Sequence, residues 1–119
     1  MYEELKPYHR AILDKLLSEQ FPGRDEILTQ VHNSTAKVVE DYKDDYGSVE
    51  FSVHARTRSP VLKHVPVYGT ALDEDGVPIE FLLHVVDGFI KELEIVKLDG
   101  TAIKKMPAAS ELDLIIAHS

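Results

Sequence analysis

The chain has 119 residues, which is the size of one domain and enough to bury a self-standing core. With 44% hydrophobic and 29% charged residues, it has the composition of an ordinary soluble globular protein, which excludes a disordered chain, a collagen and a membrane span. No cysteine is present, so disulfides and cysteine-based metal sites are excluded. The net charge of -8 repels phosphate backbones, so nucleic acid is not an expected partner.

The N-terminal third of the sequence predicts two amphipathic helices. The first begins at Pro7, which suits a first helical turn, and is stopped by Phe21-Pro22-Gly23 because proline cannot continue a helix. Its apolar stripe consists of Ile12, Leu13, Leu16 and Leu17. A second, shorter helix is expected from Arg24 to Val31, with Asp25 and Glu26 at its positive end.

From residue 35 onward, the hydrophobic period changes from that of a helix to that of a strand. Strands are expected over residues 35–42, 49–55, 65–73, 77–85 and 89–98, with a polar turn at 43–47 and a loop over 57–64. The tail from residue 107 fits either a short helix capped by Ser110 or a strand over 112–117. We therefore expect one α+β domain spanning residues 1–119, with two N-terminal helices on one face of an antiparallel, mostly meandering sheet of about five strands.

The hairpin between the last two predicted strands has two possible registers. A two-residue loop at Asp87-Gly88 would pair Phe81 with Glu94 and mix carboxylates into the apolar row. A three-residue loop that begins at Val86 pairs Phe81 with Leu93 instead. It places on one face the apolar residues Ile79, Phe81, Leu83, Val85, Phe89, Leu93 and Ile95. We therefore predict the three-residue loop, since a one-residue slip turns an apolar set to solvent.

The segment Asp73-Glu74-Asp75-Gly76 resembles the middle of a calcium-binding loop. With Gly76 at the turn position, however, the first and last ligand positions fall on Ala71 and Leu82, which cannot coordinate calcium. A tight three-residue turn explains the segment better, and that turn places Gly69 opposite Phe81.

In the predicted register, several polar residues point away from the helices. Glu80 lies opposite Glu94, and His84 lies diagonal to Glu92; like charges that face each other destabilise a sheet, so this grouping requires a reason. The functional explanations are an acidic protein-binding surface or a His–carboxylate metal or general-base site, and the structural ones are a solvated face or a dimer face. Ile90 is expected on this face too. The candidate binding residues are Glu80, Leu82, His84, Glu92 and Glu94; no catalytic residue, cofactor site or metal ligand is assigned.

Most motifs that carry chemistry are absent from the sequence. The glycines lack the spacing of a dinucleotide-binding loop or a P-loop, and neither G-x-S-x-G nor H-E-x-x-H occurs. The one basic cluster contains Arg56, Arg58 and Lys63, flanked by His54 and His64. It lacks the interleaved aromatic residues of a base-stacking surface, so it is interpreted as a solvated loop.

A family resemblance rests on the segments Asp73–Ile79, Leu82–Val85 and Glu92–Ile95, joined through the three Asp-Gly pairs. This pattern resembles a family of small bacterial proteins of unknown function with the signature D-x-D-G-V-P-V…L-L-H-V…D-G…E-L-E-V…D-G. The resemblance covers residues 5–107 and leaves the tail outside it. It implies a bacterial source, in settings where toxin–immunity pairs are common, and no activity that can be transferred to individual residues.

Three functions remain open at this point. The first is a non-enzymatic, immunity-like binding protein that masks a basic protein partner with its acidic sheet face. The second is a small ligand-binding domain or hydrolase-type enzyme that uses His84 with Glu92 or Glu94. The third is a domain that only forms a homodimer. The N-terminal residues carry neither a basic region nor an apolar signal core, so a cytoplasmic location with no membrane partner is expected.

Overall fold

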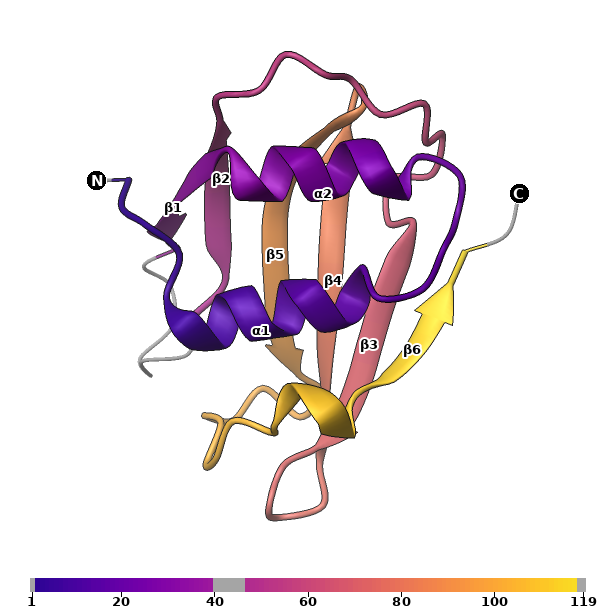
Figure 1. The fold of residues 1–119 in the computed structure, drawn as a ribbon. Helices are drawn as coiled ribbons and strands as arrows, with labels where there is room; N and C mark the ends of the chain where they lie inside the picture. The colour runs from indigo at the N-terminus through magenta and orange to yellow at the C-terminus, as the bar shows by residue number, and fades with distance from the viewer. Residues whose placement is uncertain (1, 40–46, 118–119) are drawn as a thin grey trace.

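The fold consists of two layers in the computed structural model, which describes residues 2–39 and 47–117. Helices α1 (Pro7–Leu16) and α2 (Arg24–His32) cross one face of a six-stranded antiparallel sheet (Figure 1). The strands are β1 (Ser34–Val38), β2 (Val49–Val53), β3 (Val67–Leu72), β4 (Pro78–Val86), β5 (Phe89–Lys97) and β6 (Asp113–Ile116). Their order is β1-β2-β5-β4-β3-β6. The predicted α+β fold is confirmed, and the sheet has one strand more than the number expected.

The helices form where the sequence predicts them. Helix α1 has Pro7 in its first turn but ends at Leu16, before the predicted stop at Phe21. Beyond Leu16 the chain leaves the α-helical pattern: the carbonyl of Lys15 accepts hydrogen bonds from both the amide (3.1 Å) and the hydroxyl (2.6 Å) of Ser18. Helix α2 matches its prediction to within one residue, and both helices bury their apolar side chains against the sheet.

Phe81 of β4 lies at the centre of the core and is 0% exposed. It lies opposite Gly69 of β3, as predicted from the three-residue turn at residues 74–76. A β-carbon at Gly69 would come within 2.8 Å of the Leu112 side chain, so a larger residue there would require the Leu112 side chain to shift. Other fully buried members of the core are Ile12, Leu13, Leu16, Ile27, Ile79, Leu83 and Leu93.

The β4–β5 hairpin corrects the predicted register. Val86 pairs with Phe89, so the loop is the two-residue Asp87-Gly88 turn, in which both residues have a positive φ (52° and 81°). A bulge follows: Val85 pairs with Ile90, but His84 pairs with Glu92, which leaves Lys91 as the extra residue of β5. The bulge explains why the predicted three-residue loop is wrong. After a two-residue turn, the extra residue Lys91 shifts the rest of β5 by one position, so that its apolar side chains again face the core.

This register moves two residues to the opposite faces. Ile90, predicted to point outward, is 3% exposed and belongs to the core, whereas Phe89, predicted to point inward, is half-buried on the outer side. Phe81 pairs with Ile95 rather than with Leu93. The predicted inward orientation of Leu93 and Ile95 is confirmed, since both side chains are buried.

The C-terminal tail forms both a short 3-10 helix, η1 (Ala109–Glu111), and the edge strand β6. The strand pairs antiparallel with β3, and Leu114 lies opposite Gly69. Of the two conformations that the sequence left open, the strand is therefore the larger element. Apart from Gly47, the predicted polar turn at residues 43–47 lies outside the described residues.

The turn between β3 and β4 has a buried charged anchor. The side chains of Asp73 and Lys97 are 0% and 1% exposed, and their Oδ2 and Nζ atoms are 2.9 Å apart. Burial alone would raise the pKa of Asp73, but hydrogen bonds from the Lys104 amide and the Lys97 ammonium group outweigh burial and hold this pKa well below its usual range. Asp73 thereby ties the segment after β5 to the β3–β4 turn.

Candidate functional site

The face of the sheet opposite α1 and α2 is the candidate site, and we call it the outer face. Both helices cross the other side of the sheet (Figure 1), so the central strands β4 and β5 present alternate side chains away from the helices. These side chains are half-buried, and none is in the core. The outer face is formed by Glu50 of β2, Tyr68 and Thr70 of β3, Glu80, Leu82 and His84 of β4, and Glu92, Glu94 and Val96 of β5.

His84 and Glu94 form the closest polar pair on the outer face. The Nε2 atom of His84 lies 2.8 Å from Oε1 of Glu94, and the two side chains are 21% and 33% exposed. The sequence predicts His84 to lie diagonal to Glu92, but the two residues are direct cross-strand partners, because the bulge shifts the register. The structure therefore groups His84, Glu92 and Glu94, three of the five predicted binding residues.

A further carboxylate, Glu50, extends this group. Glu50 pairs directly with Glu92 across β2 and β5, although Lys37 lies on its other side across β1 and β2. Burial raises the pKa of Glu92, and the negative charges of Glu94 and Glu50 raise it further, whereas His84 acts in the opposite direction. Sequence analysis missed Glu50 because its position depends on which strand pairs with β5.

The remaining two candidates lie farther along β4. Glu80 pairs with Val96 of β5 and Thr70 of β3, not with Glu94 as predicted. Leu82 pairs with Glu94 on one side and Tyr68 on the other. The outer face is therefore acidic over β2 and β5 and more apolar toward β3.

His64 is a site residue that sequence analysis placed only in the basic loop. Its ring stacks edge-on against His84, with the ring centroids 4.9 Å apart. The contact is held in place because the carbonyl of His64 accepts a hydrogen bond of 2.7 Å from the amide of Val85. No local pattern predicts it, because the contact depends on how the loop lies over the hairpin.

The chemistry available here is that of carboxylates and imidazoles. Glu94 can orient His84 as a proton acceptor, and the carboxylates together can hold a cationic group. Among residues 2–39 and 47–117, no group of three or more histidine or acidic residues is arranged to hold a metal ion. The space between the helices and the sheet is filled by Leu16, Phe51 and Phe81, all of which are buried.

In the described part of the chain, no helix is long and apolar enough to cross a membrane. Searches of curated proteins and of solved structures find no match to this chain. A family model does match, over residues 2–107, and its limit agrees with the sequence resemblance, which leaves the tail outside. The chain therefore belongs to the family described as domain of unknown function DUF6984.

Proposed function

We propose that the protein is a non-enzymatic binding module whose outer face binds a basic protein. The observation that carries this proposal is the direct pairing of Glu50 with Glu92, beside Glu94, on a sheet face that the two helices leave uncovered. Facing carboxylates cost stability in the free protein, and a cationic partner would relieve that repulsion. The net charge of -8 would also speed association with such a partner.

The apolar part of the outer face supports a protein partner rather than a free cation. Leu82 and Val96 lie next to the carboxylates and are half-buried, so they offer contact area beside the charges. Interfaces typically combine such an apolar centre with a polar rim. An immunity-like inhibitor of a basic toxin is one protein of this kind, and the bacterial source implied by the resemblance agrees with it.

The test is a comparison of two charge reversals in a pull-down from the organism that encodes the protein. Glu92→Lys reverses a charge on the outer face, and Glu19→Lys reverses an exposed charge after α1 as the matched control. We expect wild type and Glu19→Lys to capture a basic protein and Glu92→Lys to lose it. Calorimetry with the purified pair should then show binding that weakens with salt. A partner retained by Glu92→Lys, or no partner at all, would contradict the proposal.

A second candidate function is a small hydrolase in which His84 acts as a general base. The 2.8 Å contact with Glu94 favours it, because a carboxylate commonly orients a catalytic imidazole. Under this hypothesis, purified protein hydrolyses a generic ester or phosphoester, and His84→Gln loses the activity while its urea unfolding midpoint stays near that of wild type. Equal background rates for wild type and His84→Gln would exclude this function for the substrates tested.

A further inference from the structure

Residues 54–66 connect β2 to β3 without forming a helix or strand, and they cross the end of the sheet beside the β4–β5 hairpin (Figure 1). Ordered loops of this length commonly carry function. This loop is well anchored: the Ser59 hydroxyl donates to the carbonyl of Gly23 (2.9 Å), and the Gln30 amide donates to that of Thr57 (2.7 Å). The sequence interpretation of a merely solvated loop does not account for these anchors.

Two backbone hydrogen bonds attach the loop to the hairpin and leave a space between them. The amide of Ser59 donates to the carbonyl of Gly88 (2.8 Å), and the amide of Val85 donates to the carbonyl of His64 (2.7 Å). Between these two attachments, residues 58–64 of the loop and 85–88 of the hairpin line an open pocket of about 500 Å³. That volume lies in the range of small-molecule sites, roughly 300–1,000 Å³.

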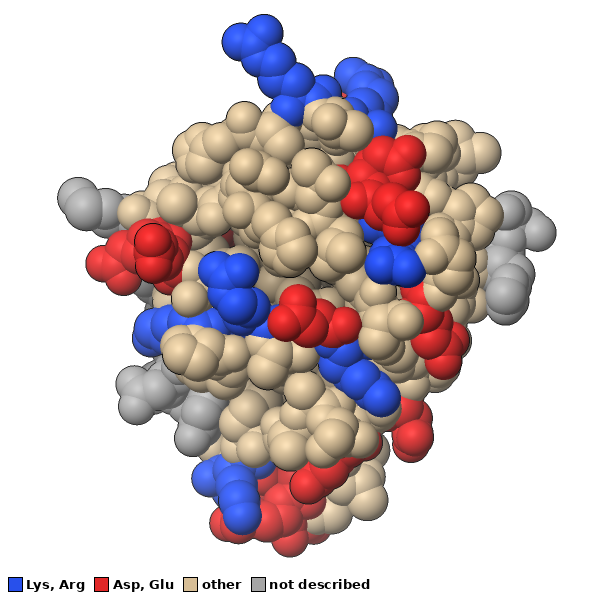
Figure 2. All heavy atoms as spheres, in the orientation of Figure 1, with Lys and Arg blue, Asp and Glu red and all other residues tan. Residues whose placement is uncertain are grey.

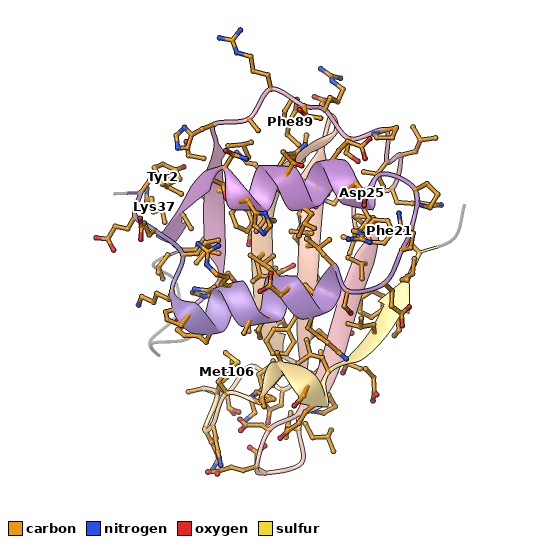
Figure 3. The ribbon with its side chains drawn as sticks, viewed as in Figure 1. Tyr2, Phe21, Asp25, Lys37, Phe89 and Met106 are labelled. Carbon is orange, nitrogen blue, oxygen red and sulfur yellow. The ribbon has the colours of Figure 1, made fainter. Side chains whose placement is uncertain are left out.

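The cavity, which we call the basic pocket, is lined by Arg58, Lys63 and His64. Of its lining residues in the described ranges, only Asp87 is acidic, so the pocket is locally positive in a chain of net charge -8. Basic side chains protrude at this end of the molecule in Figure 2. The Arg58 guanidinium carbon lies 5.7 Å from the centroid of Phe89, labelled at the upper end of the sheet in Figure 3, and this contact holds the side chain beside the pocket.

The pocket also has an exposed apolar rim. Leu62, which lines it, is 94% exposed, and Val86 on the opposite side is 43% exposed. Both side chains therefore offer apolar contact area next to the basic residues. A ligand with an apolar part next to its charged group would contact both side chains.

We propose that the basic pocket binds a small organic oxyanion, a molecule with a phosphate or carboxylate group attached to an apolar part. Arg58 and Lys63 would supply positive charge, His64 would donate a hydrogen bond, and Leu62 and Val86 would contact the apolar part. A polyanion such as nucleic acid fits less well, since it would extend past the pocket over an acidic protein. The basic pocket adjoins the outer face at His64, which contacts His84, but Arg58 and Lys63 lie outside the outer face, so this inference does not depend on the proposed protein partner.

The test is an NMR titration of the full-length protein at pH 7 and constant ionic strength. The probes are phenyl phosphate and benzoate, which share an aromatic ring and differ in the oxyanion, with benzyl alcohol as the uncharged control. We expect saturable shifts of the backbone amides in residues 58–59, 61–64 and 85–88 with one or both oxyanions and none with benzyl alcohol. The probe that binds more tightly identifies the preferred oxyanion.

Two double variants with the same net charge test the location of the site. Arg58→Gln/Lys63→Gln removes the charges of the basic pocket, whereas Arg10→Gln/Lys105→Gln removes two exposed charges elsewhere. The first should weaken binding by about tenfold or more, because charge-assisted hydrogen bonds are the strong ones, and the second should leave it within about twofold. The proposal is overturned by three results: no saturable shift with either oxyanion, equal shifts with benzyl alcohol, or equal weakening in the two double variants.

Discussion

Deleting Lys91 should leave the fold intact, although the deletion lies within a central strand. Lys91 is the extra residue of the bulge: Val85 pairs with Ile90 and His84 with Glu92 on either side of it. Without Lys91, those pairs become consecutive, and every other residue of β5 keeps its face. We expect the free energy of unfolding to change by about 1 kcal/mol or less, in the range of exposed positions.

Deleting Glu94, also on the outer side of β5, should have a much larger effect. Leu93 and Ile95 would become neighbours, and they cannot both face the core because side chains alternate along a strand. Both are buried, so one aliphatic side chain must leave the core and a cavity must form, which costs about 2–5 kcal/mol. A loss of that size removes a large share of a typical domain's stability of about 5–15 kcal/mol.

Urea unfolding followed by circular dichroism measures both deletions. With a slope of roughly 1–3 kcal/mol per molar urea, the deletion of Glu94 should lower the midpoint by about 1–5 M or prevent folding, while the deletion of Lys91 shifts it only slightly. Two-dimensional NMR of the Lys91 deletion should show shift changes confined to the end of the hairpin. If the two deletions destabilised the protein equally, or if the protein without Lys91 did not fold, the conclusion that the bulge at Lys91 sets the β4–β5 register would be wrong.

Four further variants test the core and the charged groups by urea unfolding. Phe81→Ala should lower the free energy of unfolding by about 3–5 kcal/mol, because it removes a core side chain. Glu92→Lys should change that free energy by only about 0.5 kcal/mol in either direction. If Glu92→Lys were the more destabilising of the two, the assignment of the inner and outer sheet faces would be reversed. Asp73→Asn should be less stable than wild type at pH 7, and it should lose less stability than wild type when the pH is lowered. The folded-state pKa of Asp73 is depressed, so its contribution is lost as pH falls below about 4; an equal acid loss in the variant would contradict this. Glu92 should contribute a pH dependence of stability opposite to that of Asp73, because the pKa of Glu92 is raised in the folded protein. Wild type should therefore lose stability as pH rises through the folded-state pKa, whereas Glu92→Gln should not. If the stability of wild type and Glu92→Gln changed equally with pH, a contribution from the Glu92 carboxyl group would be excluded.

Much of the fold could be predicted from local sequence patterns. Pro7 marks the start of α1, and the period of two identifies which residues of β4 point inward, from Ile79 to Val85. The turn at residues 74–76 also fixed the pairing of Gly69 with Phe81. These predictions succeed because each depends on neighbours in the chain or on the geometry of one tight turn.

The prediction of the β4–β5 register was wrong because two local signals in the sequence conflict. Asp87-Gly88 favours a two-residue turn, whereas the apolar pattern of β5 requires a different alignment with β4. A regular hairpin cannot satisfy both, and the three-residue loop predicted from the sequence satisfies only the apolar pattern. The structure satisfies both by the extra residue Lys91, and an inserted residue of this kind leaves no signature in hydrophobic periodicity.

The candidate site could be predicted only in part, because its neighbours come from distant segments. Glu92 and Glu94 were placed on the outer face by alternation within one strand. The contact of Glu50 with Glu92 depends on the pairing of β2 with β5, and that of His64 with His84 depends on a loop that crosses the hairpin. Neither arrangement follows from spacing along the chain.

The Asp87-Gly88 turn connects the acidic outer face to the basic pocket. The carbonyl of Gly88 accepts hydrogen bonds from the amide of Ser59 (2.8 Å) and from the side chain of Gln30 (2.8 Å), so the turn holds the loop and α2 together. A β-carbon at Gly88 would overlap Arg58 and Ser59, so close approach as well as positive φ requires glycine. A three-residue loop would change both the orientation of this carbonyl and the register of β5. The same two-residue turn, with its bulge, therefore places Glu92 beside His84 and positions the loop residues that surround the pocket.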